Sequence, residues 1–172
     1  MNPDDVPAFR CARLLVLLEQ LHDDVPDGID AERLGVYDFL AAHPLLLVGA
    51  DDPDQLVLRA AGFDDRAVAY ASAGQRLAAS LLRLPRDLAV LVGADLVQVT
   101  AAGRIRYRLT AGGRAAADGL NAAYAASYRR SAHIVIRRLR RLSGHRLREV
   151  VRRSVAAGLR RAARTGSSGL RS

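Results

Sequence analysis

The chain has 172 residues, half of them hydrophobic, and a formal net charge of +8 at pH 7. All 26 basic residues are arginine, which excludes a Walker A phosphate loop and Schiff-base chemistry, because both need lysine. The single cysteine, Cys11, excludes an intramolecular disulfide and a cysteine-based zinc site.

The charge is divided unevenly along the chain. Residues 1–103, the acidic half, hold 16 of the 18 acidic residues and 8 of the 26 arginines. Residues 104–172, the basic half, hold 18 arginines against Asp118 and Glu149. Either the two halves fold onto each other, or the basic half binds an acidic partner.

Helical periodicity dominates the start of the chain. Leucines at three- and four-residue steps predict a helix from Pro7 to about His22. Asp30 is a suitable N-cap for a second helix over 31–43, because its side chain can accept unpaired backbone N–H groups. Pro44 ends this helix, since the residue before a proline avoids the helical region.

Three further helical segments are predicted before residue 93. One is a short piece over 55–61, and another is the Ala- and Leu-rich stretch 67–84, with Gly74 as its break. Pro85 suits the first position of a new, short helix over 86–92.

A β-hairpin follows this short helix. Residues 96–100 form an apolar run, and residues 104–109 alternate strictly between arginine and apolar side chains. That alternation is the pattern of a half-buried strand, and the three residues between the runs include a glycine. We therefore expect two antiparallel strands joined by a tight turn.

Long helices are predicted for the rest of the chain. Thr110 is the expected N-cap of a helical region over 111–142, which breaks at Ser143-Gly144 and resumes to about Ala163. The Gly- and Ser-rich end of the chain, residues 164–172, has the composition of a disordered tail.

This order of elements predicts a mostly α fold with a small β-hairpin, in the layout of a winged helix. The expected organisation is a winged-helix domain over residues 1–112, arginine-rich C-terminal helices over 113–163 and the tail 164–172. A winged-helix layout does not fix the ligand, because such domains bind DNA, RNA or other proteins.

The strand that returns from the wing carries Arg104, Arg106 and Arg108 on one face. These arginines could contact nucleic-acid phosphates. Equally, they could form a solvated strand face opposite the apolar side chains, and the sequence leaves both interpretations open.

The helix before the wing argues against the reading of DNA sequence. A helix that reads bases carries polar side chains into the major groove, whereas this one is apolar beyond its first turn. A helix that is apolar all round is buried or packed against a partner. We therefore expect Leu88, Val90 and Leu91 to form a protein interface.

The C-terminal helices combine an apolar stripe with a basic surface. The candidate contacts for nucleic acid or an acidic partner on this surface are Arg137, Arg138, Arg140, Arg141, Arg148, Arg152 and Arg153. The stripe could pack on the rest of the fold and leave the arginines solvated. The helices could instead bind nucleic-acid backbone, or pack on an acidic or apolar helix of a partner. A membrane-surface helix ranks last, because Trp and Phe are missing from the apolar face.

No catalytic, cofactor or metal site is predicted. His22, Asp23, Asp24 and Asp27 resemble oxygen-rich ligands, but their spacing does not fit a calcium loop, and a solvated loop explains them better. The start of the chain is acidic, and no apolar run is long enough to span a bilayer. We expect a cytoplasmic protein that is not an enzyme and has no membrane partner.

Four stretches in order carry a family resemblance, at residues 13–21, 30–40, 86–110 and 123–132. In this layout the chain resembles the small middle components of bacterial ABC three-component systems, the Lamassu-like operons. The resemblance implies a non-catalytic subunit that is encoded with an SMC-like ATPase and an effector, often a nuclease, and acts against phage or plasmids. The ATPase would supply the nucleotide chemistry that a chain without lysine lacks.

Two other functions remain open from the sequence. One is a stand-alone winged-helix transcriptional regulator, which would bind DNA sequence-selectively. The other is a general DNA-backbone binder, whose affinity would depend steeply on salt and would be equal for unrelated sequences.

Overall fold

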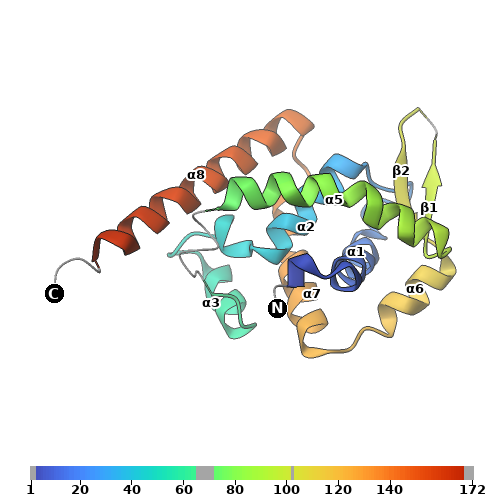
Figure 1. The fold of residues 1–172 in the computed structure, drawn as a ribbon, viewed down its shortest axis with the longest axis horizontal. Coiled ribbons are helices and arrows are strands. Elements are labelled where there is room, and N and C mark those ends of the chain that lie inside the picture. Colours follow the sequence, from blue (N-terminus) through green and yellow to red (C-terminus); the bar gives the residue numbers. More distant parts are fainter. Residues whose placement is uncertain (1–2, 65–71, 102, 169–172) are drawn as a thin grey trace.

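The computed structural model describes residues 3–64, 72–101 and 103–168 (Figure 1). Within them the chain is mostly helical, with a small two-stranded antiparallel sheet, which confirms the predicted fold class at this level. The elements are η1 (Pro3–Asp5), α1 (Pro7–Leu21), α2 (Ala31–Ala42), η2 (Pro44–Leu46), α3 (Pro53–Ala60), α5 (Ala73–Gly93), β1 (Val97–Thr100), β2 (Arg106–Leu109), α6 (Ala111–Asp118), α7 (Ala123–Leu139) and α8 (Gly144–Ser168).

The core is built where α1, α2 and α7 pack together. Leu17 of α1, Leu40 of α2 and Val135 of α7 are each completely buried there. The Asp30 side chain caps α2 as predicted, accepting a hydrogen bond from the Arg33 backbone N–H at 2.8 Å. Because α7 shares one hydrophobic core with α1 and α2, no boundary between cores falls at residue 112.

The hairpin lies at one end of the molecule, beside α6 (Figure 1). Its register pairs Val97 with Leu109, and in β2 the arginines are exposed while Leu109 is buried, as the alternation predicts. Ile29, between α1 and α2, bridges to Tyr107 through two backbone hydrogen bonds of 3.0 and 2.8 Å. Gly28 makes this approach possible, since it has a φ of 94° and a Cβ there would lie 2.9 Å from the Tyr107 carbonyl oxygen.

The junction between hairpin and α6 is equally close. The Thr110 hydroxyl caps α6 by accepting from the Gly113 N–H at 2.9 Å, as predicted, and it donates to the Asp95 carbonyl at 2.6 Å. A Cβ at Gly113 would lie 1.8 Å from the Leu96 carbonyl oxygen. Only glycine fits at this position, because α6 crosses directly over the start of the hairpin.

The predicted break before the wing is wrong. Pro85 does not begin a short helix but lies inside α5, and Gly74 also lies inside that helix. A proline within a helix costs about 3 kcal/mol or more through its missing N–H and its clash with the preceding turn. The core offsets this cost, because Leu84, Leu88 and Leu91 on either side of Pro85 are all buried. The first part of the predicted segment 67–84 lies outside the described residues.

The predicted helix over 111–142 is two helices. α6 ends at Asp118 and α7 begins at Ala123. The Arg129 guanidinium stabilises the break by donating to the Ala117 and Leu120 carbonyl oxygens, both at 2.6 Å. An arginine that satisfies the last carbonyls of a helix favours its termination.

The predicted disordered tail is wrong for residues 164–168, because α8 continues to Ser168. Residues 169–172 lie outside the described residues. α8 packs along the first half of α5 and against η2, burying Leu147 and Val151 (Figure 1). Arg161, farther along, donates to the Leu45 carbonyl oxygen at 2.9 Å.

Candidate functional site

Many arginines of the basic half pair with acids of the acidic half. The pairs that join the two halves are Arg129–Glu19, Arg137–Asp54, Arg138–Asp52, Arg138–Asp54, Arg140–Asp24 and Arg148–Glu32. The hydrogen bond from Arg137 lowers the pKa of Asp54, and the one from Arg138 lowers the pKa of Asp52. Within the described residues, at least five of the 18 arginines of the basic half thus pair with acids of the acidic half.

These pairs reduce the basic surface that the sequence suggested for an acidic partner. Arg137, Arg138, Arg140 and Arg148 already have carboxylate partners across the fold. Arg153 pairs with Glu149 one turn away within α8. Of the interpretations of the C-terminal helices, packing of their apolar stripe on the rest of the fold describes α7 and the start of α8 best.

Two of the predicted contact residues on these helices remain available. Arg141 and Arg152 are exposed, and neither forms an ion pair with another residue in the described part of the chain. Arg141 precedes the start of α8 and Arg152 lies within α8, so the two are separated along the chain.

The wing arginines are exposed as predicted. Arg104 lies in the turn, and Arg106 and Arg108 border an open hollow together with Asp27 and Thr100. Arg108 donates a long hydrogen bond of 3.4 Å to the Pro26 carbonyl oxygen. The wing strand thus presents its arginines beside the loop that joins α1 to α2.

The predicted protein interface on the helix before the wing is wrong for two of its three residues. Leu88 and Leu91 are 2% exposed, because they pack into the chain's own core. Val90 is 56% exposed on the opposite face of α5, and Leu82, two turns earlier on that face, is 82% exposed. The helix is therefore apolar on both faces, with one face buried by this chain.

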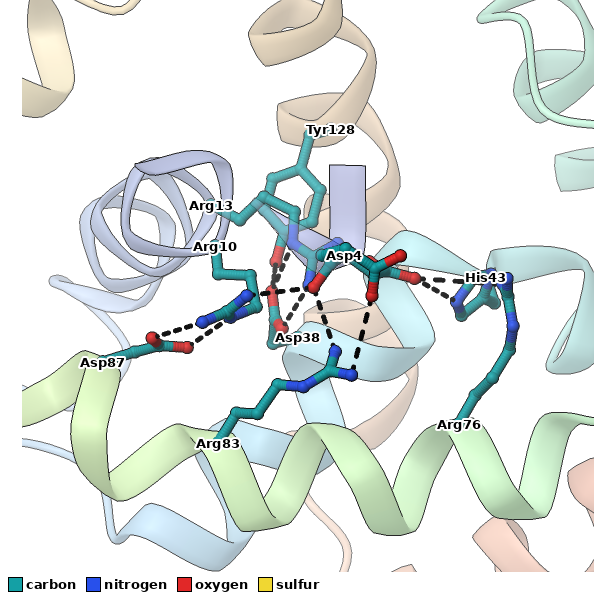
Figure 2. A network of polar contacts seen from close by, with 10 residues as sticks. Asp4, Arg10, Arg13, Asp38, His43, Arg76, Arg83, Asp87 and Tyr128 are labelled. Carbon is teal, nitrogen blue, oxygen red and sulfur yellow. Dashed lines mark hydrogen bonds and ion pairs between the residues drawn. The ribbon is translucent and has the colours of Figure 1, made fainter. Parts of the chain in front are cut away.

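A buried ionic network, which the sequence did not reveal, joins α1, α2 and α7 (Figure 2). Arg13 donates to both carboxylate oxygens of Asp38, with Nε–Oδ1 at 3.1 Å and Nη2–Oδ2 at 2.9 Å. The Tyr128 hydroxyl donates to Asp38 Oδ1 at 2.7 Å. All three side chains are almost completely buried.

A second buried pair joins α1 to α5. Arg10 Nε donates to Asp87 Oδ2 at 2.7 Å, and Arg10 Nη2 donates to Asp87 Oδ1 at 2.9 Å. The hydrogen bond that Arg10 donates to Asp87 raises the pKa of Arg10. This two-point pairing holds α5 against α1 directly after Pro85, and it fixes the orientation of both helices.

The network continues to Asp4 in the N-terminal turn η1. Arg13 hydrogen-bonds its carboxylate, and His43 Nε2 lies 3.6 Å from Asp4 Oδ2. The hydrogen bond from His43, together with the charge of Arg13, holds the pKa of Asp4 well below its usual range. Asp4 is therefore a fixed anion at neutral pH, unsuited to proton transfer.

Burial raises the pKa values of two neighbouring groups that are neutral when protonated. It raises the pKa of the Tyr128 hydroxyl, to which the Asp38 charge also contributes, and it raises the pKa of the Cys11 thiol. A thiol with a raised pKa is a poor nucleophile. The network accordingly has the properties of a structural and anion-binding arrangement.

Sequence reasoning missed Arg10, Arg13, Asp38 and Asp87. The available signal is a charged residue on the apolar face of a predicted helix, because such a charge must find a buried partner. Arg10 and Arg13 lie two turns and one turn before Leu17, and Asp38 lies between Tyr37 and Phe39 in a run of buried residues. The partners are far apart in sequence, so this signal does not identify the pairs.

Within the described residues, no group of three or more His, Cys, Asp or Glu side chains is arranged to hold a metal ion. Nor does that part of the chain contain a helix of the length and apolarity needed to cross a membrane. Comparison of the chain with protein families, with curated proteins and with solved structures gave no match.

Proposed function

We propose that the chain is a non-catalytic winged-helix adaptor that docks on an SMC-like ATPase in a defence complex with an effector subunit. The order of elements supports the winged-helix layout: α1, the extended residue Ile29, α2, α5 and then the hairpin. Ile29 forms a single antiparallel bridge with Tyr107 of β2, which ties the hairpin to the segment between the first two helices.

The observation that carries the proposal is the outer face of α5. Val90 and Leu82 are large apolar side chains on this face, exposed by 56% and 82%. Of the three charged residues between them along the helix, Asp87 is buried and Arg83 pairs with Asp5, so Arg86 is the exposed charge without an ion pair to another described residue. A helix with this surface offers few hydrogen bonds to base edges, whereas its exposed apolar side chains suit a protein partner.

The ATPase and the effector come from the family resemblance of the layout, and the chain's composition is consistent with that role. A chain without lysine cannot supply the lysine of a phosphate loop, so nucleotide hydrolysis falls to the partner. The adaptor contributes surfaces, and the buried ionic network holds the helices that carry those surfaces in a fixed arrangement.

The test is co-purification of the chain with the coiled-coil ATPase encoded beside its gene. The double variant Leu82→Asp with Val90→Asp is expected to reduce recovery of the ATPase at least tenfold, because two charges would be buried at the interface. Leu56→Asp on α3 is the matched control, since Leu56 is 76% exposed on a different surface, and it should leave recovery unchanged.

Circular dichroism should show the same helix content and unfolding midpoint for both variants. Equal recovery of the ATPase with Leu82→Asp/Val90→Asp and with the wild-type chain would contradict the proposed face. The absence of any adjacent coiled-coil ATPase gene would contradict the adaptor function itself.

The exposed wing arginines favour a second candidate function, binding of DNA backbone. In this case affinity would be equal for unrelated sequences, and it would fall steeply with salt. Arg104→Ala with Arg106→Ala is expected to lower the slope of log affinity against log salt by about 2, if each arginine contacts one phosphate. An unchanged slope rejects the wing as the contact, and a sequence-selective gel shift that survives competitor DNA favours a regulator instead.

A further inference from the structure

A small pocket lies where α1, α2 and α5 converge beneath the N-terminal turn η1. Its volume is about 130 Å³. Its titratable lining consists of Arg10, Arg13, His43, Arg76, Arg83, Asp4 and Asp5. The arginines come from α1 and α5, whereas both carboxylates come from the three-residue turn η1 (Figure 2).

Asp4 lines this pocket and lies at the centre of the polar contacts between its arginines (Figure 2). Arg13 hydrogen-bonds the Asp4 carboxylate, and Arg76 Nη1 lies 3.9 Å from its Oδ2 atom. The Asp4 carbonyl oxygen accepts from Arg10 Nη1 at 3.1 Å and from Arg83 Nη1 at 3.0 Å. The side chain and the backbone of one residue thus both act as acceptors for converging arginines (Figure 2).

The cations of the pocket differ in what else they contact. Arg10 and Arg13 have buried carboxylate partners of their own, Asp87 and Asp38. Arg76 and Arg83 differ: among the residues that the structure describes, their ion pairs go to Asp4 and Asp5. Removal of the two N-terminal carboxylates would therefore leave two arginines without a counter-charge at the mouth of a pocket.

The turn that supplies these carboxylates is short, and its described side-chain contacts are polar. It is three residues long, and α1, which follows it directly, is the principal element against which it packs. Asp5 is 63% exposed. Ion pairs of Asp4 and Asp5 hold the turn against the pocket.

We propose that this pocket is a binding site for an acidic peptide segment of a partner, and that the chain's own Asp4-Asp5 turn occupies it in the absence of that partner. The ligand is a pair of neighbouring carboxylates with a free backbone carbonyl between them. The site is separate from the outer face of α5, and the inference does not depend on the proposed adaptor function.

Occupation by the chain itself sets the strength of competition. A segment tethered next to its site acts at an effective concentration of about millimolar. To displace it, a partner peptide must have a dissociation constant well below its own concentration, or must contact the site through several acidic residues. The wild-type chain should accordingly bind a short acidic peptide weakly, and loss of the internal carboxylates should expose the site.

The experiment uses the full chain with Asp4→Ala and Asp5→Ala and measures fluorescence polarisation of a labelled peptide with the sequence of residues 2–8. The double variant is expected to bind this peptide at least tenfold more tightly than the wild-type chain. A control peptide with asparagine at both aspartate positions should bind neither protein. Adding Arg76→Ala and Arg83→Ala to the double variant should abolish the binding.

Each contrary result overturns the proposal. These results are equal weak binding by wild type and double variant, equal binding of the two peptides, or binding that survives loss of Arg76 and Arg83. Inorganic phosphate in place of the peptide is expected to bind at least tenfold more weakly, because it is a single anionic group where the peptide has two carboxylates. If phosphate binds as tightly as the peptide, the site recognises a small oxyanion and not a peptide.

Circular dichroism verifies that the double variant is folded. Should the alanine variant not fold, Asp4→Asn with Asp5→Asn preserves the shape of the turn and its backbone carbonyl contacts. The asparagine variant removes the same two charges, so it is expected to gain binding of the acidic peptide as well, and failure to do so would equally reject the proposal.

Discussion

Replacement of Asp38 by alanine is expected to destabilise the protein severely. Asp38 is 4% exposed and accepts three hydrogen bonds, two from Arg13 and one from the Tyr128 hydroxyl. The substitution would leave a guanidinium without its two-point partner and a hydroxyl without an acceptor, and both groups would remain buried between α1, α2 and α7.

The magnitude follows from the burial of the pair. Removing one partner of a buried ion pair costs about 3–5 kcal/mol, because it leaves the other charge uncompensated. An unsatisfied buried hydroxyl adds about 1–3 kcal/mol. Asp4 still contacts Arg13 and offsets part of the loss. A net loss of about 4 kcal/mol is a large share of the roughly 5–15 kcal/mol that stabilise a typical domain.

The assay is urea denaturation followed by circular dichroism at 222 nm, with the slope of the transition checked for constancy. In a thermal scan, about 4 kcal/mol corresponds to a decrease in Tm of roughly 8–16 °C for a chain of this size. Asp118→Ala is the matched control, because Asp118 is an exposed aspartate at the end of α6, and its removal should leave both midpoints unchanged.

A double-mutant cycle isolates the pair. Arg13→Met combined with Asp38→Ala should be less destabilising than the sum of the single changes by more than about 1 kcal/mol, since the second change removes the stranded charge. A loss below about 1 kcal/mol for Asp38→Ala alone, within the range of exposed ion pairs, would refute the assignment of this pair to the core.

Three further changes test other parts of the fold. Gly113→Ala should destabilise by about 1–3 kcal/mol through overpacking, whereas Gly112→Ala should stabilise by up to about 1 kcal/mol through helix propensity, as measured by urea denaturation. Asp52→Ala with Asp54→Ala should raise the salt concentration needed for elution from heparin, because it releases two arginines of α7. The pKa of Asp4 lies below its ordinary value of 3.8. The ionised Asp4 therefore stabilises the fold above pH 3.8, and this stabilisation is lost as the pH falls below that value. Asp4→Asn should flatten this part of the acid unfolding curve.

These three tests have their own controls. The charge-matched control on heparin is Asp23→Ala with Asp51→Ala, two exposed acids that form no ion pair within the described chain, and equal elution of both double variants would contradict the release of arginines. Equal stability of the two glycine variants would reject the close crossing of α6 over the hairpin. If Asp4→Asn leaves the acid unfolding curve unchanged, the lowered pKa of Asp4 is rejected as a source of stability.

The features that depend on neighbouring residues could be predicted from the sequence. Asp30 and Thr110 cap their helices because the acceptor and the donor are three residues apart. The alternation in β2 likewise depends on residues within one strand. Such signals are short-range, so the sequence contains them in a form that can be recognised without the fold.

The features that depend on distant residues could not be predicted in the same way. Arg10 and Asp87 are separated by 77 positions, and no local pattern indicates that they pair. The same limitation applies to Pro85, whose cost within α5 is offset by packing against other helices. For Leu88, apolarity predicts that the side chain is covered, but it does not say whether the chain or a partner covers it.

The position of α7 has a consequence for how the protein is made. α1 and α2 are synthesised early, but the helix that completes their core ends at Leu139. Until that helix leaves the ribosome, the apolar faces of α1 and α2 are not covered by it. The Asp38 carboxylate likewise lacks the Tyr128 hydroxyl that donates to it in the folded protein. The part of the chain up to residue 103 is acidic, and the arginines of the basic half that pair with its carboxylates emerge only with α7 and α8.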